Sequence, residues 1–251
     1  MSRLLVIPAA GLGSRLGGSV PKVLVPVAGV SMIDRLLALY RSAVDRIVIV
    51  ANPVFAADLE RHARAHRDAD RIECRVQPSP TGMLDAILLA MPAAAAASVS
   101  SVWVTWCDQV AVHPKTVERL AARTGPARHD ALVMPTVTRE QPYIHLERDH
   151  AGRIVRVLHR REGDAMPDAG ESDMGLFAMS PSTYRDLLPQ YAHEVAVGHK
   201  TGERNFLPFI PWAAARATVT TFPAEDPMEA VGVNTPEELA LVENYLRTRI
   251  L

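Results

Sequence analysis

The chain has 251 residues, of which 48% are hydrophobic, and a formal net charge of −1 at pH 7. That length fits one α/β domain, or two small ones, and supplies a sizeable core. The nearly balanced charge gives no overall basic field for nucleic acid or an anionic membrane, so any phosphate site must be local. No apolar stretch reaches the ~18–20 residues of a membrane span, and the N-terminus leaves no room for a signal peptide. We therefore expect a soluble, cytoplasmic protein.

Strand and helix patterns alternate along the first half of the chain, which is typical of a mostly parallel sheet with helices on both faces. The patterns predict strands at 4–8, 46–51, 72–77, 101–106 and 131–135, and helices at 32–40, 55–66, 82–91 and from 113 onward. The alanine run at 93–97 reads as a poorly specified connection. Trp103 and Trp106 are expected in the core.

From about 142 to 179 the pattern changes to short strands separated by polar turns that contain glycine. Strands at 143–147, 153–158 and 175–179 predict a small antiparallel elaboration over the strand ends. Helices near 181–188 and 203–212, a strand at 217–222 and a helix at 236–248 complete the prediction. We expect a single Rossmann-like α/β domain over residues 1–251, with the elaboration at about 142–179 covering the strand ends.

The first predicted strand leads into a loop of small residues, 9–18, with the sequence AAGLGSRLGG, followed by VPKVL at 20–24. Small side chains let backbone N–H groups approach an anion, and two cations, Arg15 and Lys22, can neutralise it. A triphosphate is held in this way. The expected nucleotide contacts in this stretch are Pro8, Ala9, Ala10, Gly11, Leu12, Gly13, Ser14, Arg15 and Lys22.

A dinucleotide-binding fold is the main competitor for this loop. Its G-x-G-x-x-G pattern does not fit, because Leu16 occupies the third glycine position. The second predicted strand also ends at Asn52, with no acidic residue to bind ribose hydroxyl groups.

The loop and Pro21-Lys22 together resemble the A-A-G-x-G-x-R-(x)n-P-K signature of the sugar-1-phosphate nucleotidylyltransferases, in the MobA-like NTP transferase superfamily. The resemblance implies a GT-A type fold, an NTP substrate with UTP or CTP favoured, Mg²⁺ as the cofactor, and release of pyrophosphate. It implies that Arg15 acts on the leaving pyrophosphate and Lys22 on the α-phosphate. An acceptor phosphate is already nucleophilic, so no general base is needed, and no Ser-His-Asp or Cys-His arrangement is visible.

A second motif follows the third predicted strand, as Gln77-Pro78-Ser79-Pro80-Thr81-Gly82. The Gln77 amide offers a donor and an acceptor to a base edge, and Thr81-Gly82 opens a helix N-terminus. The stretch resembles the family's base-binding segment, which implies that Gln77, Pro80, Thr81 and Gly82 contact the nucleotide. An ordinary proline-rich turn before a helix is the alternative.

Two oxygen ligands for Mg²⁺ are implied at distant positions. Asp108 ends the fourth predicted strand and matches the aspartate of the family's G-D-x-P motif, although Cys107 replaces its glycine. Asn234 lies in Gly232-Val233-Asn234, which resembles the family's G-V-N element. Mg²⁺ prefers hard oxygen ligands and often takes only one or two from protein. A glycosyltransferase D-x-D site is disfavoured, because Gln109-Val110 supplies no second acid.

Asn234 has a structural alternative. The following segment, Thr235-Pro236-Glu237-Glu238, is a capping box with proline at the first helical position. Asn234 could therefore belong to the turn before that helix. The two interpretations are compatible, because the cap would fix the direction of Asn234.

The acceptor side departs from the family pattern. The segment 171–177, ESDMGLF, resembles E-x-N-T-G, but Asp173 stands where the family has a sugar-contacting Asn; His159 stands where it has a Glu. Pro142-Tyr143 replaces a Tyr-Gly-Arg-Ile segment, and 201–207 resembles a G-E-Y-Y-L/I-T stretch. The implied acceptor residues are Tyr143, His159, Glu171, Asp173 and Gly175. These departures predict the same reaction on an altered acceptor: an unusual sugar phosphate, a cyclitol phosphate, or another small phosphate or phosphonate.

The resemblance spans the chain and is closest to the uridylyltransferase domain of N-acetylglucosamine-1-phosphate uridylyltransferases. Since the chain ends where that domain ends, we expect no acetyltransferase half. Two alternatives stay open: an isoprenoid- or molybdopterin-type cytidylyltransferase, and a nucleotide-binding protein without catalysis. The isoprenoid type is suggested by Ile7-Pro8-Ala9-Ala10-Gly11, although Asp108 lacks its Ala-Arg-Pro sequel. The sequence leaves the base, the acceptor and the oligomeric state open, a homodimer included.

Other residues that attract attention have simpler interpretations. His62 and His66 are four residues apart on a helical pattern, which is a metal-ligand spacing, but flanking arginines would repel a cation. We expect a solvated helix face there. Cys74 and Cys107 lack metal-ligand spacing and are expected to be free thiols that behave as small hydrophobes.

Overall fold

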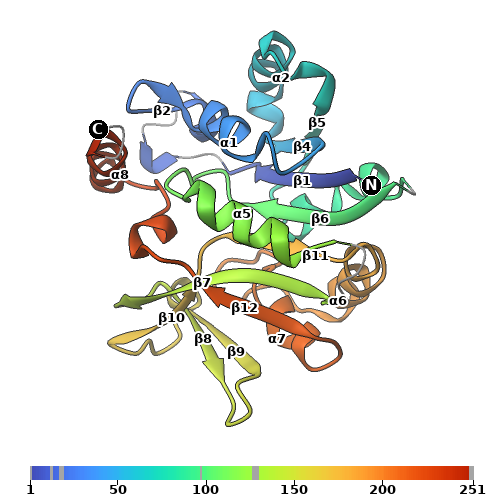
Figure 1. Cartoon of the computed structure of the whole chain (residues 1–251), viewed down its shortest axis with the longest axis vertical. Helices are drawn as coiled ribbons and strands as arrows, with labels where there is room; N and C mark the ends of the chain where they lie inside the picture. The colour runs from blue at the N-terminus through green and yellow to red at the C-terminus, as the bar shows by residue number, and fades with distance from the viewer. Residues whose placement is uncertain (1, 12–13, 17–19, 97, 126–129, 249–251) are drawn as a thin grey trace.

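The structure is a computed structural model that describes residues 2–11, 14–16, 20–96, 98–125 and 130–248. An eight-stranded sheet runs through the molecule in the order β10-β7-β11-β6-β1-β4-β5, with β12 paired to β7 (Figure 1). The strands are β1 (Ser2–Ala9), β4 (Arg46–Ala51), β5 (Ile72–Val76), β6 (Val99–Thr105), β7 (Leu132–Glu140), β10 (Ala169–Asp173), β11 (Leu176–Met179) and β12 (Val219–Pro223). Their arrangement confirms the predicted α/β class.

Parallel pairing dominates the N-terminal half of the sheet. β1 pairs in parallel with both β4 and β6, and β4 pairs in parallel with β5. The registers Ala9↔Ala51 and Val6↔Val104 bring the carboxyl ends of these strands to one edge. Loops that follow parallel strands therefore converge there, and this edge carries the site.

Helices cover both faces of the sheet. Alternate residues of β1 pack into two cores: Leu5 and Ile7 face one and Leu4 and Val6 face the other. The helices are α1 (Met32–Tyr40), α2 (Ala56–Ala65), α3 (Met83–Leu88), α4 (Met91–Ala94), α5 (Pro114–Arg123), α6 (Leu188–Glu194), α7 (Phe209–Ala214) and α8 (Pro236–Thr248). The core with Leu5 includes residues of α1, α2, α5 and α8, and the core with Leu4 includes residues of α3, α4, α6 and α7.

Local sequence explains the first helix well. Five buried side chains recur on one face of α1, and the Ser31 side chain accepts a hydrogen bond from the Asp34 backbone N–H at 3.1 Å as the N-cap. The capping box at Thr235 is also present. The Thr235 hydroxyl accepts from the Glu238 N–H, and a Glu238 carboxylate oxygen accepts from the Thr235 N–H at 3.0 Å.

Several predicted elements need correction. Of the strands in 142–179, only β8 (Ile144–Arg148) and β9 (Ile154–His159) form a separate antiparallel sheet, while β10 and β11 join the main sheet. Neither β10 nor the hairpin of β2 (Pro26–Val27) and β3 (Val30–Ser31) was predicted from the sequence. Part of the alanine run is structural, because Ala93 and Ala94 lie in α4 and are buried in the core.

The C-terminal helices also differ in their bounds. The helix predicted at 203–212 begins only at Phe209, and the helix near 181–188 continues to Glu194 after a π-helical turn at Thr183–Leu187. In the described part of the chain, no helix has the length and apolarity that crossing a membrane requires.

Candidate active site

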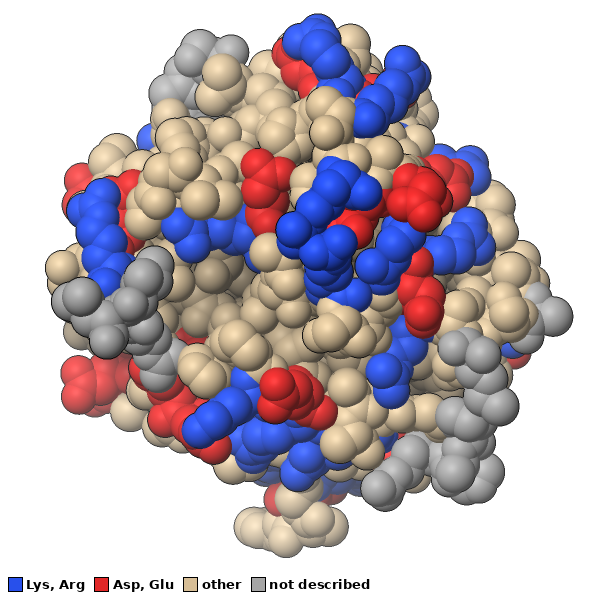
Figure 2. Space-filling view, turned by 45° about the horizontal axis from the view of Figure 1, so that its top comes forward, with Lys and Arg blue, Asp and Glu red and all other residues tan. Residues whose placement is uncertain are grey.

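A cavity of about 360 Å³ opens beside the carboxyl end of β6. Its wall is formed by the loop between β6 and α5, by residues of β7, β8, β9 and β10, and by the segment before α8. On the face shown in Figure 2, Lys and Arg side chains are interspersed with Asp and Glu, which agrees with the balanced sequence charge. Binding of a phosphate would therefore depend on individual cationic side chains near the cavity and not on a broad basic surface.

The Lys22 ammonium group is held between two oxygen atoms. Its Nζ lies 2.5 Å from Asp108 Oδ2 and 2.8 Å from Asn234 Oδ1, and Arg15 Nη2 lies 3.4 Å from the same Asn234 oxygen. Burial lowers the pKa of Lys22, but the Asp108 carboxylate, with a smaller effect of Cys107, raises it above its usual range. The four residues that were predicted as catalytic or metal-binding therefore lie together, although Arg15 and Asn234 are 219 positions apart in the sequence.

Backbone contacts fix the position of these oxygens. The Val233 N–H donates to the Asp108 carbonyl at 3.2 Å, and the Asn234 N–H donates to Glu238 Oε2 at 2.7 Å. A Cβ at Gly232 would lie 3.2 Å from Asp108 Cγ and 3.3 Å from Asn234 Nδ2, so a larger residue would crowd the pair. The capping box is compatible with the expected ligand role of Asn234, because Glu238 binds the Asn234 backbone while Asn234 Oδ1 accepts from Lys22.

The donor set fits a hard divalent cation. A carboxylate and an amide oxygen already converge on one cationic group, the Lys22 ammonium, and oxygen ligands of this kind suit Mg²⁺. No cluster of three or more His, Cys, Asp or Glu with metal-site geometry occurs among the described residues. A cation bound at Asp108 and Asn234 would therefore take its remaining ligands from phosphate oxygens and water.

The loop of small residues at 9–18, which is expected to bind phosphates and is called the phosphate loop below, contacts Asn52. In the sequence, Asn52 indicated only that the chain lacks the acidic residue of a dinucleotide-binding fold. Asn52 is buried; its amide donates to the Ala10 carbonyl at 3.0 Å, and its Oδ1 accepts from the Val54 N–H at 2.9 Å. Pro8 and Ala9 end β1, Gly11 is exposed with open space around it, and Arg15 lies in a short 3₁₀ turn. Leu12 and Gly13 lie outside the described residues, and only the backbone of Ser14 is described.

The second motif docks against the 201–207 segment. Gln77 is buried at the end of β5, and its amide donates to the Gly82 carbonyl at 3.0 Å. The Arg204 N–H donates to the Thr81 carbonyl at 2.8 Å, and Arg204 also pairs with Asp85 of α3 at 3.0 Å. Pro80 lies in the turn between Gln77 and Thr81. These contacts join the two motifs into one substructure, and its ion pair links residues that are 119 positions apart in the sequence, Asp85 and Arg204.

The predicted acceptor residues fall into two groups. Tyr143, His159 and Asp173 line the cavity. The Tyr143 and His159 rings pack edge to face at 5.2 Å, His159 Nδ1 is 3.0 Å from Asn205 Nδ2, and burial lowers the pKa of His159. Asp173 is buried and accepts from the Gly175 N–H at 2.8 Å.

Glu171 and Gly175 differ from the expectation, since neither is among the described residues that line the cavity. Both Glu171 carboxylate oxygens are bound by Arg148 at 2.7 Å, which ties β10 to β8 and leaves the carboxylate little capacity for a ligand. Gly175, with φ of 64°, lies under Trp106, where a Cβ would be 2.2 Å from the indole ring. Its role is to let the ring pack closely.

Trp106, Gln109 and Arg139 are among the lining residues of the cavity that were not predicted as site residues. Trp106 was expected in the core, and only Trp103 is fully buried there. Trp106 instead packs on Phe177 and Phe206 and contributes to the cavity wall. A tryptophan next to the aspartate at a strand end is the signal that would have indicated this position.

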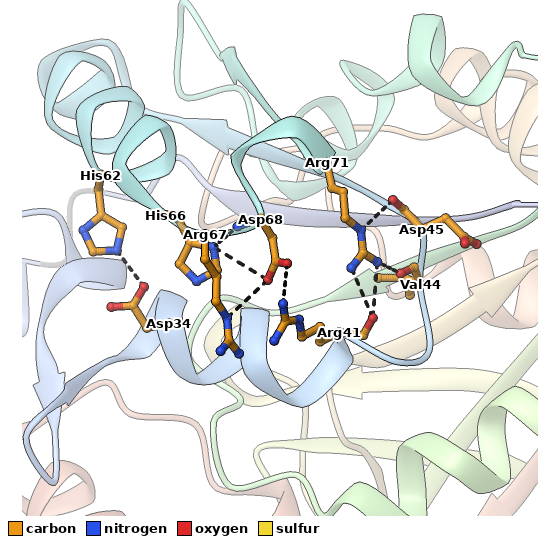
Figure 3. Close-up of polar contacts among 9 residues, drawn as sticks. All are labelled: Asp34, Arg41, Val44, Asp45, His62, His66, Arg67, Asp68 and Arg71. Carbon is orange, nitrogen blue, oxygen red and sulfur yellow. Dashed lines mark hydrogen bonds and ion pairs between the residues drawn. The ribbon is translucent and has the colours of Figure 1, made fainter.

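His62 of α2 makes a contact with a neighbouring helix, which the expected solvated helix face did not include. His62 Nε2 lies 2.7 Å from Asp34 Oδ1, so α2 is tied to the start of α1 (Figure 3). Asp68 lies between Arg41 and Arg67 in the same view, with the Arg41 guanidinium at 3.0 Å. The cysteines are free, as expected, and burial raises the pKa of Cys74 to about 11 and that of Cys107 to about 12.

The mixed, mostly parallel sheet brings a lysine, an aspartate and an asparagine together at its carboxyl edge. Comparison with known proteins gives the class of protein in which this arrangement occurs. Residues 5–171 match the model of the MobA-like NTP transferase domain, and the chain belongs to this family.

Curated relatives are similar to this chain over its whole length. The bifunctional protein GlmU of Azotobacter vinelandii is 31% identical over 256 residues, covering 100% of this chain and 53% of the relative. GlmU of Pseudomonas putida strain GB-1 is 30% identical over 253 residues, covering 99% of this chain and 52% of the relative. The chain thus spans about half the length of the curated relatives it matches.

A solved structure supports the fold. The crystal structure of a protein assigned as a glucose-1-phosphate thymidylyltransferase, from Bacillus anthracis and in complex with a sucrose, superposes with a TM-score of 0.73. The alignment covers 98% of this chain and 96% of that chain, at 15% sequence identity.

Proposed function

We propose that the protein transfers a nucleoside monophosphate from an NTP, UTP or CTP, to a small phosphate acceptor and releases pyrophosphate. The observation that carries this proposal is the Lys22 ammonium held by Asp108 and Asn234 at the edge of the cavity. A lysine poised beside two oxygen ligands can exchange those contacts for a phosphate oxygen and a metal. Family membership and the curated relatives support the same chemistry.

The side chains have distinct roles in this proposal. Lys22 neutralises charge on the α-phosphate, and Arg15, which is exposed on the loop, binds the leaving pyrophosphate. Asp108 and Asn234 would hold Mg²⁺, which would supply further charge stabilisation at the phosphates. Gln77, Thr81 and Gly82 form the base-binding side, and Asn52 keeps the phosphate loop in place.

The acceptor binds in the cavity lined by Tyr143, His159 and Asp173. The proposed acceptor is a non-standard sugar phosphate or similar small phosphate. We place the whole chain, 1–251, in a single catalytic domain, and a cytoplasmic location agrees with the soluble substrates.

The test is pyrophosphate release by the purified chain with Mg²⁺, each NTP in turn, and a panel of sugar-1-phosphates, cyclitol phosphates and phosphonates. Release that requires one NTP and one acceptor, and that is lost in Lys22→Ala, supports the transferase. The matched control is Lys115→Ala, since Lys115 lies on the exposed start of α5. NTP binding without release from any acceptor would instead support a nucleotide-binding protein.

A further inference from the structure

One wall of the cavity is built by residues linked through consecutive hydrogen bonds. The Gly175 N–H donates to Asp173 Oδ2 at 2.8 Å, and the Trp106 N–H donates to the Gly175 carbonyl at 2.8 Å. The Gln109 N–H then donates to the Trp106 carbonyl at 3.2 Å. Asp173, Trp106 and Gln109 all line the cavity, and these hydrogen bonds connect the β10–β11 turn to the segment that follows β6.

Asp173 is a buried carboxylate without a basic partner at ion-pair distance in the described parts of the chain. It is 7% exposed and accepts a hydrogen bond from the Gly175 backbone N–H. Arg139 also lines the cavity and lowers the pKa of Asp173 slightly, but its guanidinium donates to the Ala230 carbonyl at 3.0 Å. The effect of burial is larger than that of Arg139 and raises the pKa of Asp173 to about 6, so the carboxyl group is mostly ionised at neutral pH. A buried, unpaired carboxylate is costly unless a cation reaches it.

Gln109 adds an unsatisfied acceptor to this wall. The residue is 7% exposed, and its Oε1 has no hydrogen-bond partner among the residues that the structure describes. Leaving a buried amide oxygen unpaired costs about 1–3 kcal/mol. A donor on a bound molecule, reached directly or after rotation of the amide, would remove that cost.

The lining is more acidic than a phosphate-binding cavity needs to be. Most of its carboxylates are accounted for: Asp108 binds Lys22, Glu162 accepts from Thr201 Oγ1 at 2.8 Å, Glu238 caps α8, and Glu203 is half-exposed to water. Asp173 is left as the one described lining carboxylate that is both buried and without a side-chain partner. The charged lining residues are Asp108, Glu162, Asp173, Glu203 and Glu238 against Arg15, Arg139 and Arg161.

We propose that the acceptor carries an ammonium group at its non-reacting end, which binds the Asp173 carboxylate and donates to the Gln109 amide oxygen. This inference rests on the proposed function for the identity of the reacting phosphate. An ammonium has three N–H donors, so it can serve both oxygens and neutralise the carboxylate. A hydroxyl would leave the Asp173 charge uncompensated. The indole of Trp106 in the same wall also favours a cation. Amino-sugar phosphates and aminoalkyl phosphates share this chemistry.

Two matched pairs of probes test the proposal and separate its two sources. Glucosamine 1-phosphate is compared with glucose 1-phosphate, and 2-aminoethyl phosphate with 2-hydroxyethyl phosphate. Binding of each probe to the full chain is measured by calorimetry with Mg²⁺ and NTP, and pyrophosphate release is measured in parallel. In at least one pair we expect the amine to bind about 10-fold or more tightly than its hydroxyl partner, since a site built for a donor and a charge rejects the analogue that lacks them.

Variants of the two wall residues complete the experiment. Asp173→Asn keeps the shape and removes the charge, so the preference for the amine should disappear. Gln109→Met removes the acceptor and should weaken amine binding about 5- to 30-fold, which is the effect of one unmade hydrogen bond. Asp70→Asn, at an exposed position in the 3₁₀ turn Ala69–Arg71, is the control.

Each outcome decides the matter. Tighter binding of an amine that depends on Asp173, without pyrophosphate release, keeps the ammonium site and rejects the proposed reaction. Equal or tighter binding of the hydroxyl members in both pairs overturns the ammonium site, and so does an amine preference that survives in both variants. Failure of both amine probes to bind overturns it as well, whatever the NTP does.

Discussion

The backbone of Arg204 lies directly against the α-carbon of Gly82. A Cβ at Gly82 would be 2.5 Å from the Arg204 carbonyl oxygen and 2.6 Å from its nitrogen, and the φ of Gly82 is 119°. Glycine is therefore required at this position both for the space and for the backbone conformation. Through this contact the segment that contributes Thr201 and Asn205 to the cavity is held against the loop that contains Gln77.

We expect Gly82→Ala to damage both halves of the site at once. The added methyl group must push Arg204 away, because the atoms it meets are backbone atoms that cannot rotate aside. The displacement should raise the KM for the NTP about 10-fold or more and lower the stability by about 2 kcal/mol or more. Steady-state kinetics and urea unfolding measure the two effects.

Gly152→Ala is the matched control for that variant. Gly152 also has a positive φ, 79°, but a Cβ there meets nothing within 4 Å. It should show only the conformational cost of about 1 kcal/mol, with unchanged kinetics. Similar kinetic losses in both variants would contradict the contact-based explanation.

The pair of Lys22 and Asp108 gives a second prediction. Lys22→Ala and Asp108→Ala should each reduce kcat about 10²- to 10³-fold, since preorganised charges at the reacting phosphates contribute on that scale. Circular dichroism should show that both variants fold. Turnover near that of the wild type in either variant would remove that residue from the proposed mechanism.

Asn52 gives a prediction about positioning. Asn52→Ala removes the donor to the Ala10 carbonyl and the acceptor for the Val54 N–H. The phosphate loop should lose its anchor, so the KM for the NTP should rise about 5- to 30-fold, the effect of about 1–2 kcal/mol of lost hydrogen bonding. Asn52→Asp, which keeps the acceptor but loses the donor, isolates the contact to Ala10. An unchanged KM in both variants would show that the loop is held by other contacts.

The sequence predicted those parts of the fold that local patterns encode. The buried face of α1, the apolar parallel strands and the capping box at Thr235 all follow from periodicity or from short motifs. β10 escaped prediction because its sequence, AGESD, is short and polar, and it forms an edge strand of the main sheet by pairing with β7. Nothing local in such a segment indicates a strand.

The site residues also separate into those that a local motif indicated and those that only the structure shows. Lys22, Asp108 and Asn234 were indicated by motifs, and the structure brings them within hydrogen-bond distance. Gln109 and Asn52 have no comparable signal, because their importance comes from contacts made in three dimensions: one lines a cavity, and the other reaches back to a loop 42 positions earlier. The helix predicted at 203–212 failed for a related reason. The Arg204 N–H donates to the Thr81 carbonyl and the Arg204 carbonyl accepts from the Leu84 N–H, so these backbone groups are not available for helical hydrogen bonds.

Asp173 links the cavity to the pH dependence of stability. Burial raises its pKa from 3.8 to about 6 in the folded protein, so the folded state binds this proton more tightly than the unfolded state does. The stabilisation is fully present below pH ~4 and is lost as the pH rises to ~6; above that, the ionised carboxylate lowers stability by up to about 3 kcal/mol. Asp173→Asn removes this effect and preserves the acceptor for the Gly175 N–H.

We therefore expect Asp173→Asn to be more stable than the wild type at pH ~7.5, with the difference shrinking as the pH approaches ~4.5. Urea unfolding at the two pH values measures it, and Asp70→Asn, at an exposed position, should match the wild type at both. A substitution that raises stability while it abolishes the preference for an amine would show that the carboxylate is kept for binding at the expense of folding. Lower stability of Asp173→Asn at neutral pH would mean instead that the carboxylate is already compensated within the protein, which would argue against the ammonium site.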